Sequence, residues 1–307
     1  MRIISLISSA TEIICNLGCS DFLVGISHEC DYPETIIDLP VCSEPRFNVD
    51  GSSIEVDNQV KSLLQEALSI YRIREDKISE LNPDIIITQS QCNVCAVSID
   101  DVQNALKKNL KINSQVISLE PNTLNDVWMD IKKLGIKINE NLAADKIIST
   151  INNEIMYLKK HNQNKSNIDV ACIEWIEPLM FAGNWVPEIV DIAGGNDSFG
   201  QVGKHSSWSN YSELYKKNPD KIIFMPCGYS IDKTKTEIEI LYKTREWSEL
   251  KAVKSGNIYI TDGSQYFNRP GPRLLDSIKI MNDIIFDRDR YGFFGKGWEK
   301  IGKGFVA

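Results

Sequence analysis

Two short motifs occur twice in the chain, in the same order, and this repeat constrains the fold more than any other feature. Residues 12–25 and 188–200 share a spacing in which Glu is followed by Ile and an aliphatic residue, by Gly six positions on and by Asp nine positions on. The second motif, Asn-Pro-Asp ahead of an aliphatic run, stands at 82–84 and at 218–220. The repeat predicts two similar lobes, with a cleft between them.

The pattern within each lobe predicts alternating strands and helices. Residues 8–11 are expected to form a polar loop that caps a helix from Glu12, and Gly18 ends that helix. From about 139 to 160 there is no Gly or Pro and apolar residues keep helical spacing, which predicts one long helix. The expected fold is α/β: two Rossmann-like lobes with central, mostly parallel sheets, at 1–137 and 164–307, joined by a rigid helix at 138–163.

The composition excludes several classes of partner. The formal net charge of −8 argues against nucleic acid and anionic membranes. No apolar run approaches the ~20 residues that span a bilayer. Near the N-terminus, Arg2 is the one basic residue and Glu12 interrupts the apolar run, so we predict no signal peptide and a cytoplasmic protein unless a leader is missing. The eight cysteines are then expected to be thiols.

Polar and aromatic residues follow the predicted strands at their carboxyl ends, where open α/β sheets bind ligands. This topology predicts one interlobe cleft that collects residues from both halves of the chain. The expected ligand-binding residues are His28, Glu29, Cys30, Asp31, Gln89, Glu174, Trp175, Trp185, Tyr229, Tyr266, Phe267, Asn268 and Arg269.

Cys92 and Cys95 form a Cys-x-x-Cys pair that could bind a metal ion or act as a redox pair. With Cys30, His28 or Cys227 they could complete a soft tetrahedral site; the alternative is two ordinary thiols after a buried strand. His28 could ligate cobalt or iron, act as a general base, or be a hydrogen-bonded loop residue.

The aromatic residues suit a large planar ligand, because they bury ring area at little cost in side-chain entropy. About three of the five at 175, 185, 229, 266 and 267 are expected in the cleft. Trp208 and Trp247 are expected to be packing residues. Arg269 could pair with a ligand carboxylate, amide or phosphate, whereas Arg273 is as well suited to a structural ion pair.

Four motifs together resemble the cobalamin and iron-siderophore solute-binding proteins, over residues 3–285. They are Ser9-Ala10-Thr11-Glu12, the Asn-Pro-Asp strands, the long helix, and Arg269-Pro270-Gly271-Pro272-Arg273. The runs His28-Glu29-Cys30-Asp31-Tyr32-Pro33 and Cys92-Asn93-Val94-Cys95 are similar to those of a subgroup called cobalamin-binding and lacking a signal peptide.

The resemblance implies two lobes on a rigid helix and a bound cobalamin, another corrinoid, a tetrapyrrole or a metal chelate. It also implies docking to an ABC permease through one surface carboxylate per lobe. Asp76 matches this position in the first lobe, whereas Ser212 stands there in the second, with Glu213 one residue away.

Two functions therefore remain open. The first is a cytoplasmic binding protein for a small metal-containing ligand. The second is an enzyme that uses the same cleft, with the thiols, a metal ion at Cys92 and Cys95, or acid–base chemistry by His28. A third, transport outside the cell, would need an export signal. The chain shows no nucleophile elbow, phosphate loop or dinucleotide fingerprint.

Overall fold

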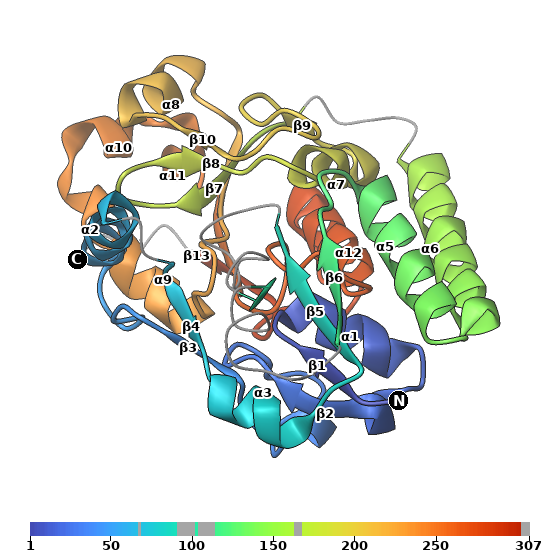
Figure 1. The fold of residues 1–307 in the computed structure, drawn as a ribbon. Helices are drawn as coiled ribbons and strands as arrows, with labels where there is room; N and C mark the ends of the chain where they lie inside the picture. Colours follow the sequence, from blue (N-terminus) through green and yellow to red (C-terminus); the bar gives the residue numbers. More distant parts are fainter. Residues whose placement is uncertain (67–68, 91–101, 104–113, 163–167, 302–307) are drawn as a thin grey trace. The chain divides into compact units, whose positions relative to one another are not determined.

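A computed structural model describes residues 1–66, 69–90, 102–103, 114–162 and 168–301, and its chain divides into two compact units (Figure 1). Unit 1 comprises Met1–Pro121 and Asn125–Ser149, and unit 2 comprises Asn122–Leu124 and Thr150–Ala307. The boundary falls inside α6 (Asn141–His161), the long helix that the sequence predicted. The lobe limits predicted at 137 and 164 stay predictions.

Unit 1 is built on a parallel sheet in the order β2-β1-β5-β6. Ile4, Leu6 and Ile86 are buried in its core. A separate antiparallel pair, β3 with β4, lies in the same unit. Its elements are β1 (Ile3–Ser5), α1 (Ser8–Asn16), a 3-10 turn (Ser20–Phe22), β2 (Leu23–Ile26), a second 3-10 turn (Glu34–Ile36), β3 (Ser43–Pro45), α2 (Ser53–Gln65), β4 (Tyr71–Ile73), α3 (Glu75–Leu81), β5 (Ile85–Gln89), β6 (Gln115–Leu119) and most of α5 (Leu124–Lys137).

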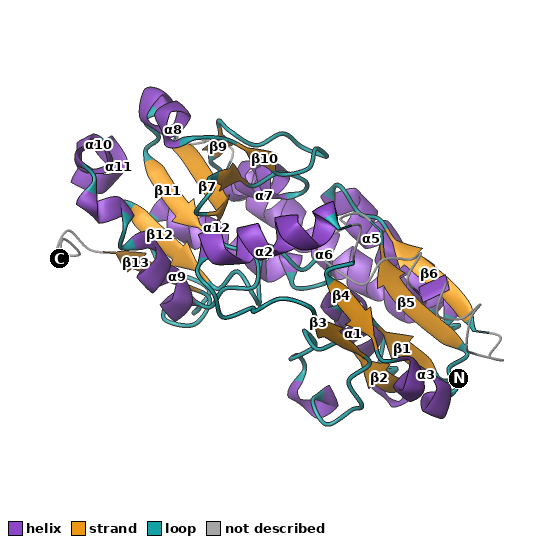
Figure 2. Ribbon diagram, turned by 60° about the vertical axis from the view of Figure 1, so that its left-hand side comes forward, coloured by secondary structure: helices purple, strands orange, loops and turns teal. Residues whose placement is uncertain are grey.

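Unit 2 has a mixed sheet in the order β10-β8-β7-β11-β12-β13, with β9 paired to β7. The central strands β7, β11 and β12 are parallel, and the antiparallel β8 and β13 flank them (Figure 2). Ile173, Phe224 and Trp247 are buried in its core. Its elements are β7 (Asp169–Trp175), β8 (Met180–Phe181), α7 (Val186–Ala193), β9 (Asn196–Asp197), β10 (Ser207–Trp208), α8 (Tyr211–Lys217), β11 (Lys221–Phe224), α9 (Ile231–Ile238), a 3-10 turn (Leu241–Lys243), α10 (Arg245–Glu249), α11 (Lys251–Lys254), β12 (Ile258–Thr261), α12 (Leu274–Phe286) and β13 (Trp298–Ile301).

The Asn-Pro-Asp repeat has one structural role in both units. Asn82 and Asn218 end α3 and α8 in the left-handed conformation, with φ of 42° and 48°. Asn tolerates this region better than most residues. The following aspartates, Asp84 and Asp220, each accept a hydrogen bond from the backbone N–H at the start of a neighbouring strand, at 2.7 and 2.8 Å. The motif therefore ends a helix and fixes the start of the adjoining strand.

The other repeat, around Glu12 and Glu188, differs between the units. The prediction of a loop at 8–11 was wrong, because α1 begins at Ser8 and Glu12 is a fully buried residue inside it. Glu188 lies in the first turn of α7, as expected, and its Oε2 accepts the backbone N–H of Leu124 over 2.8 Å. Glu188 therefore caps the start of α5 instead of serving a ligand.

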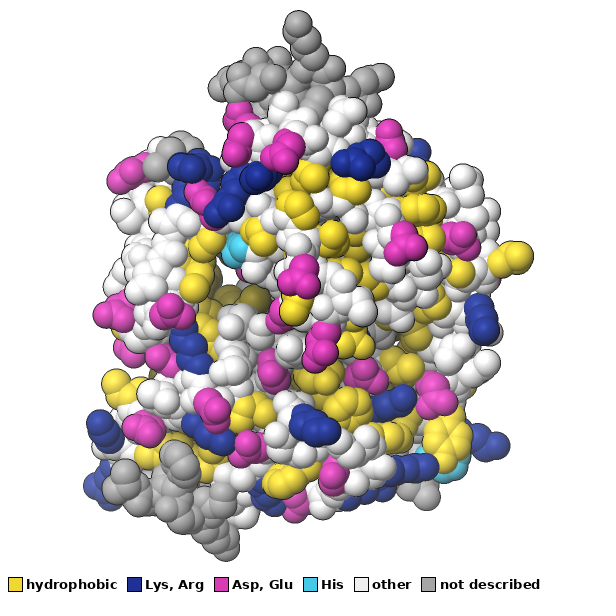
Figure 3. Space-filling view, turned by 90° about the horizontal axis from the view of Figure 1, so that it is seen from below, with side chains coloured by type: hydrophobic (Ala, Val, Ile, Leu, Met, Phe, Trp, Pro, Cys, Tyr) yellow, Lys and Arg dark blue, Asp and Glu magenta, His cyan; other side chains and the backbone are white. Residues whose placement is uncertain are grey.

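The predicted α/β class and the long helix are confirmed, although the sheet of unit 2 is more mixed than expected. Within the described ranges, no helix combines the length and apolar character needed to cross a membrane. On the face shown in Figure 3, acidic and basic side chains are interspersed with hydrophobic ones, and no patch of one charge dominates.

Candidate functional site

The polar run after β2 lies at the carboxyl end of the sheet of unit 1, where Ser43 holds His28. The Nδ1 atom of His28 lies 2.9 Å from the Ser43 hydroxyl oxygen, which also accepts the backbone N–H of His28 over 3.3 Å. The imidazole packs on the ring of Tyr71, with centroids 5.0 Å apart. Its Nε2 atom is buried and has no hydrogen-bond partner in the described part of the chain. One ring nitrogen is thus fixed and the other is unused.

Burial lowers the pKa of His28 to about 4, and the nearby Glu44 carboxylate opposes this only partly. The imidazole is therefore neutral at pH 7. A neutral imidazole whose Nδ1–H donates to Ser43 would carry a lone pair at the buried Nε2, which is the tautomer of a metal-ligating histidine. In the other tautomer Nε2 would be a hydrogen-bond donor.

The three residues after His28 have different surroundings. The Tyr71 hydroxyl donates to Oε1 of Glu29 over 3.1 Å, so this carboxylate faces the same side as His28. Cys30 is buried, and its sulfur lies 3.1 Å from the Thr11 hydroxyl of α1. Asp31 is exposed. The structure therefore brings His28, Glu29 and Tyr71 together and turns Cys30 toward α1.

Gln89 is the last residue of β5, so it also lies at the carboxyl end of the sheet, and it is 3% exposed. Cys92 and Cys95 lie outside the described residues, so their role as metal ligands or a redox pair stays a prediction. Cys227, the third thiol predicted as a ligand, is exposed in unit 2. Over the described ranges, no group of three or more His, Cys, Asp or Glu side chains is placed to hold a metal ion.

An aromatic pair lies at the carboxyl ends of two strands in the sheet of unit 2. Trp175 is the last residue of β7, and Tyr229 follows β11, its parallel neighbour. Their ring centroids are 5.2 Å apart at an angle of 57°. Tyr229 is 3% exposed and Trp175 is partly exposed, so a buried tyrosine ring packs against an indole that keeps accessible surface. Burial, with smaller effects of Glu237 and Cys227, raises the pKa of the Tyr229 phenol, which stays protonated.

Glu174, which precedes Trp175 in β7, is held by Ser206, the residue just before β10. Its Oε2 accepts the Ser206 hydroxyl over 2.7 Å, and that hydroxyl oxygen accepts the backbone N–H of Gly183 over 3.0 Å. The backbone N–H of Cys227 donates to the Glu174 carbonyl over 3.3 Å. The carboxylate thus has a fixed position next to Trp175.

Trp185 and Phe267, both predicted to contact the ligand, lie in the interior of unit 2. Trp185 is 5% exposed, and its indole N–H donates to the Phe267 carbonyl over 2.6 Å. Phe267 is fully buried, and its own N–H donates to Ser277 over 3.0 Å. Because an indole has one donor, this bond leaves Trp185 none for a ligand. The two residues tie α7 and α12 together.

The segment after β12 supplies the remaining predicted residues. Asn268 donates to the Met225 carbonyl over 2.9 Å, so its amide stabilises the loop. Arg269 is 8% exposed and one of its guanidinium nitrogens lies 3.4 Å from the Ser264 hydroxyl. Tyr266 is partly exposed.

The packing role predicted for two tryptophans is confirmed for one. Trp247 is fully buried in the core of unit 2. Trp208 is 57% exposed on β10, so its prediction as a packing residue was wrong. The polar residues on both sides of Trp208, Ser207 and Ser209, are the signal that could have indicated exposure.

The carboxylates expected to meet a permease also differ between the units. Asp76 is exposed in the first turn of α3. In α8, Ser212 bonds to Asn210, and Glu213 accepts the Ser209 hydroxyl over 2.6 Å and pairs with Lys217 at 3.3 Å. The carboxylate of Glu213 is therefore engaged by Lys217 of its own helix and by Ser209, which precedes that helix.

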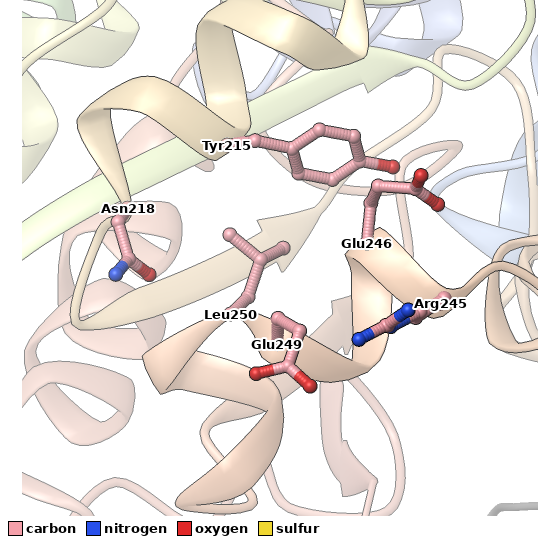
Figure 4. Close-up of a pocket in the computed structure, with 6 residues that line it drawn as sticks. All are labelled: Tyr215, Asn218, Arg245, Glu246, Glu249 and Leu250. Atoms are coloured by element: carbon pink, nitrogen blue, oxygen red, sulfur yellow. The ribbon is translucent and has the colours of Figure 1, made fainter.

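A surface pocket of about 430 Å³ lies elsewhere on unit 2 and includes none of the predicted residues. In Figure 4 the hydroxyl end of Tyr215 points toward Glu246, and Leu250 lies between Tyr215 and Glu249. Arg245 and Asn218 complete the lining. The aromatic pair of β7 and β11 is thus separate from this pocket.

Similar proteins place the chain in a family. The sequence profile of the periplasmic binding protein family matches residues 3–264. An uncharacterized ABC transporter substrate-binding lipoprotein of Bacillus subtilis is 20% identical over 295 residues, 93% of this chain and 80% of the relative. A vitamin B12-binding protein of Vibrio parahaemolyticus is 22% identical over 281 residues, 90% of this chain and 86% of the relative.

A solved structure extends the comparison to the fold. A periplasmic heme-binding protein from Pseudomonas aeruginosa superposes with a TM-score of 0.69 at 15% identity, covering 93% of this chain and 92% of the other. At that identity the match concerns the fold alone. The family profile, in contrast, spans most of the sequence, and the chain therefore belongs to the periplasmic binding protein family.

Proposed function

We propose that this protein is a solute-binding protein for a planar metal chelate, with a corrinoid such as cobalamin as the first candidate and a porphyrin as the second. The observation that carries the proposal is the pairing of a partly exposed Trp175 with a buried Tyr229 at adjacent strand ends. A supported indole face binds a flat ring system with little loss of side-chain entropy. The vitamin B12-binding and heme-binding relatives favour the same ligand class.

His28 adds a second element to the proposal. Its neutral imidazole is fixed through Nδ1, and its buried Nε2 has no partner in the described residues, so a ligand that reaches this atom would supply one. If the metal chelate has a vacant axial position, the lone pair of Nε2 could bind the metal. If its axial positions are filled, the other tautomer could donate its Nε2–H to an acceptor on the ligand. The enzyme that the sequence also allowed stays a prediction, since its thiol pair lies outside the described residues and no described contact favours it.

A titration tests the proposal. We expect cyanocobalamin or hemin to change its visible spectrum on mixing with the protein, and Trp175→Ala to weaken that binding about tenfold or more, as loss of a large aromatic contact does. Phe294→Ala, which removes an exposed aromatic ring near β13, is the matched control and should bind normally. Absence of both a spectral change and calorimetric heat for every corrinoid and porphyrin tested would sink the proposal.

Transport is the role that the relatives favour, because one is an ABC transporter substrate-binding lipoprotein and others are periplasmic. These names favour a location outside the cytoplasmic membrane over the cytoplasmic location predicted from the sequence. Fractionation of the producing cells with an antibody to the protein decides between them.

A permease partner would meet the exposed Asp76 in unit 1, and Asp76→Ala should then lower uptake without changing ligand affinity.

A further inference from the structure

The hydroxyl of Ser43 contacts His28 twice, and the hydrogen-bonding capacity of this hydroxyl bears on which tautomer the imidazole adopts. The Ser43 oxygen accepts the backbone N–H of His28 over 3.3 Å and lies 2.9 Å from its Nδ1 atom. Ser43 is 1% exposed, so water has little access to it. Among the described residues, no third group bonds to this hydroxyl. Its proton therefore has one acceptor within reach, the lone pair of Nδ1.

The two neutral tautomers of His28 leave different numbers of buried polar groups without a partner. With the proton on Nδ1, the ring donates to Ser43, and both the serine proton and the Nε2 lone pair are left unpaired in the described part of the chain. With the proton on Nε2, the serine donates to Nδ1, and of these groups the Nε2–H alone is left unpaired. Because an unpaired buried polar group destabilises the folded state, the second tautomer is favoured.

Neighbouring charges do not change this count. Glu44 is the carboxylate that acts on the charge of His28, and it pairs with Arg72 at 2.9 Å and with Arg74 at 3.2 Å. Burial keeps the imidazole neutral at pH 7, because it lowers the pKa of His28. The ring thus carries a single proton, and the contact with Ser43 is the described hydrogen bond that bears on its position.

We propose that Ser43 is a positioning residue that places the proton of His28 on Nε2, so that a ligand reaching this atom meets a hydrogen-bond donor instead of a metal ligand. This inference rests on the proposed function and narrows it, because the ligand must then present an acceptor to unit 1. A carboxamide carbonyl of a corrinoid or a carboxylate of a porphyrin has the required lone pair. Coordination of a metal ion would need the proton on Nδ1, which leaves the Ser43 hydroxyl unpaired.

Nuclear magnetic resonance measures the tautomer of the unaltered protein without any ligand. The two ring nitrogens differ in chemical shift according to which one carries the proton, and long-range proton–nitrogen correlation with ¹⁵N-histidine records both. The chain has three histidines, and His28→Gln assigns the signals of this one. We expect the Nε2–H tautomer at pH 7. The Nδ1–H tautomer, or equal populations of the two, would overturn the proposal.

Two variants of Ser43 test its part in this preference. Ser43→Thr keeps the hydroxyl and should keep the Nε2–H tautomer. Ser43→Ala removes the hydroxyl and should give a mixture of the two tautomers, because neither ring nitrogen then has a described partner. If the alanine variant holds the Nε2–H tautomer alone, Ser43 does not position the proton.

Matched ligands test whether His28 acts as a donor or binds a metal. Aquacobalamin has an axial water that an imidazole can replace, whereas cyanocobalamin has both axial positions firmly filled; hemin likewise pairs with metal-free protoporphyrin. In the pair that binds, we expect His28→Ala to weaken both members by the same factor, about tenfold, the effect of leaving a ligand acceptor unpaired. Equilibrium dialysis with absorbance detection measures each dissociation constant. His161→Ala, which removes an exposed histidine from the end of α6, is the control and should leave every affinity unchanged.

The outcomes separate this inference from the proposed function. A loss confined to aquacobalamin or hemin, with the visible spectrum of imidazole coordination in the unaltered protein, would show that His28 binds the metal. Unchanged affinities in His28→Ala would show that it does not contact the ligand. Either result overturns the donor role while the proposed function stands. If the unaltered protein binds none of the four compounds, the proposed function fails and the donor role with it, whereas the tautomer is still decided by the resonance measurement.

Discussion

Lys221 is a buried cation at the first position of β11, on the side of unit 2 where its strands begin. It is 5% exposed, and its Nζ donates to the Tyr259 hydroxyl over 2.8 Å and to the Ile284 carbonyl over 2.9 Å. Burial lowers the pKa of Lys221 to about 8; Lys300 lowers it further, and Asp287 partly opposes the shift. The Lys221 ammonium group thus has two acceptors, but its burial makes the charged form costly.

This lowered pKa predicts a contribution of Lys221 to stability that rises with pH. Between pH 8 and the ordinary value of 10.5, the unfolded chain holds a proton on Lys221 that the folded chain has lost. The contribution of Lys221 to the free energy of unfolding therefore increases with pH through this window. Buried thiols such as those of Cys15 and Cys42, whose pKa burial raises to about 11, contribute in the opposite direction. Because ordinary tyrosines begin to titrate near pH 10, urea denaturation between pH 8 and 9.5 is the suitable measurement.

A variant assigns the effect to this residue. Lys221→Met should lose the contribution of this lysine, so that the slope of its free energy of unfolding against pH becomes more negative between pH 8 and 9.5, while the exposed Lys216→Met should leave the slope as it is. An unchanged slope in Lys221→Met would show that another group causes the pH dependence.

The sequence analysis placed candidate residues by their position after a predicted strand, and this rule located some of them better than others. Trp175 and His28 lie where the strand ends placed them, because a strand's carboxyl end fixes the backbone within a residue or two. Trp185 and Phe267 were placed by the same reasoning, yet both pack inside unit 2 through one indole hydrogen bond. That bond joins residues 82 positions apart, so no local pattern could indicate it.

At the scale of elements, the Asn-Pro-Asp motif was recognised as a repeat, and its mechanism came from the structure. Two left-handed asparagines end helices and two aspartates hold the starts of neighbouring strands. The start of α1, in contrast, was misplaced by four residues, because Ser8, Ser9 and Thr11 resemble a capping loop and are instead buried helical residues. Burial in tertiary contacts overrides the weak preference of such residues for caps.

Removing the two aspartates should weaken both units by a similar mechanism. We expect Asp84→Ala to lower the free energy of unfolding by about 1 kcal/mol, from loss of one hydrogen bond to a partly solvated charge. Asp220→Ala should cost somewhat more, since Asp220 also pairs with Lys251 at 2.9 Å. Urea denaturation gives both values. Because asparagine keeps an acceptor oxygen, Asp84→Asn should retain most of the stability; equal losses for the Asn and Ala variants would show that the hydrogen bond is not the cause.

At the scale of the whole molecule, the chain forms two compact units, and the long helix α6 belongs to both. A ligand could therefore stabilise one unit or both. A ligand that binds only the folded state adds RT ln(1 + [L]/Kd), about 2.7 kcal/mol at one hundred times the dissociation constant. The sequence predicts one ligand site that draws residues from both lobes. A ligand held by both units protects both against unfolding, whereas a ligand held by one unit protects that unit alone.

Hydrogen exchange resolved along the chain distinguishes these cases. With a saturating ligand from the titration above, we expect slower exchange in the core strands of unit 1, such as β1 and β5, and of unit 2, such as β7 and β11. Trp175→Ala at the same ligand concentration is the control, and its roughly tenfold weaker binding should lower the protection by about half in both units together. Protection confined to β7 and β11 would show that unit 2 alone holds the ligand, and His28 would then have no part in binding.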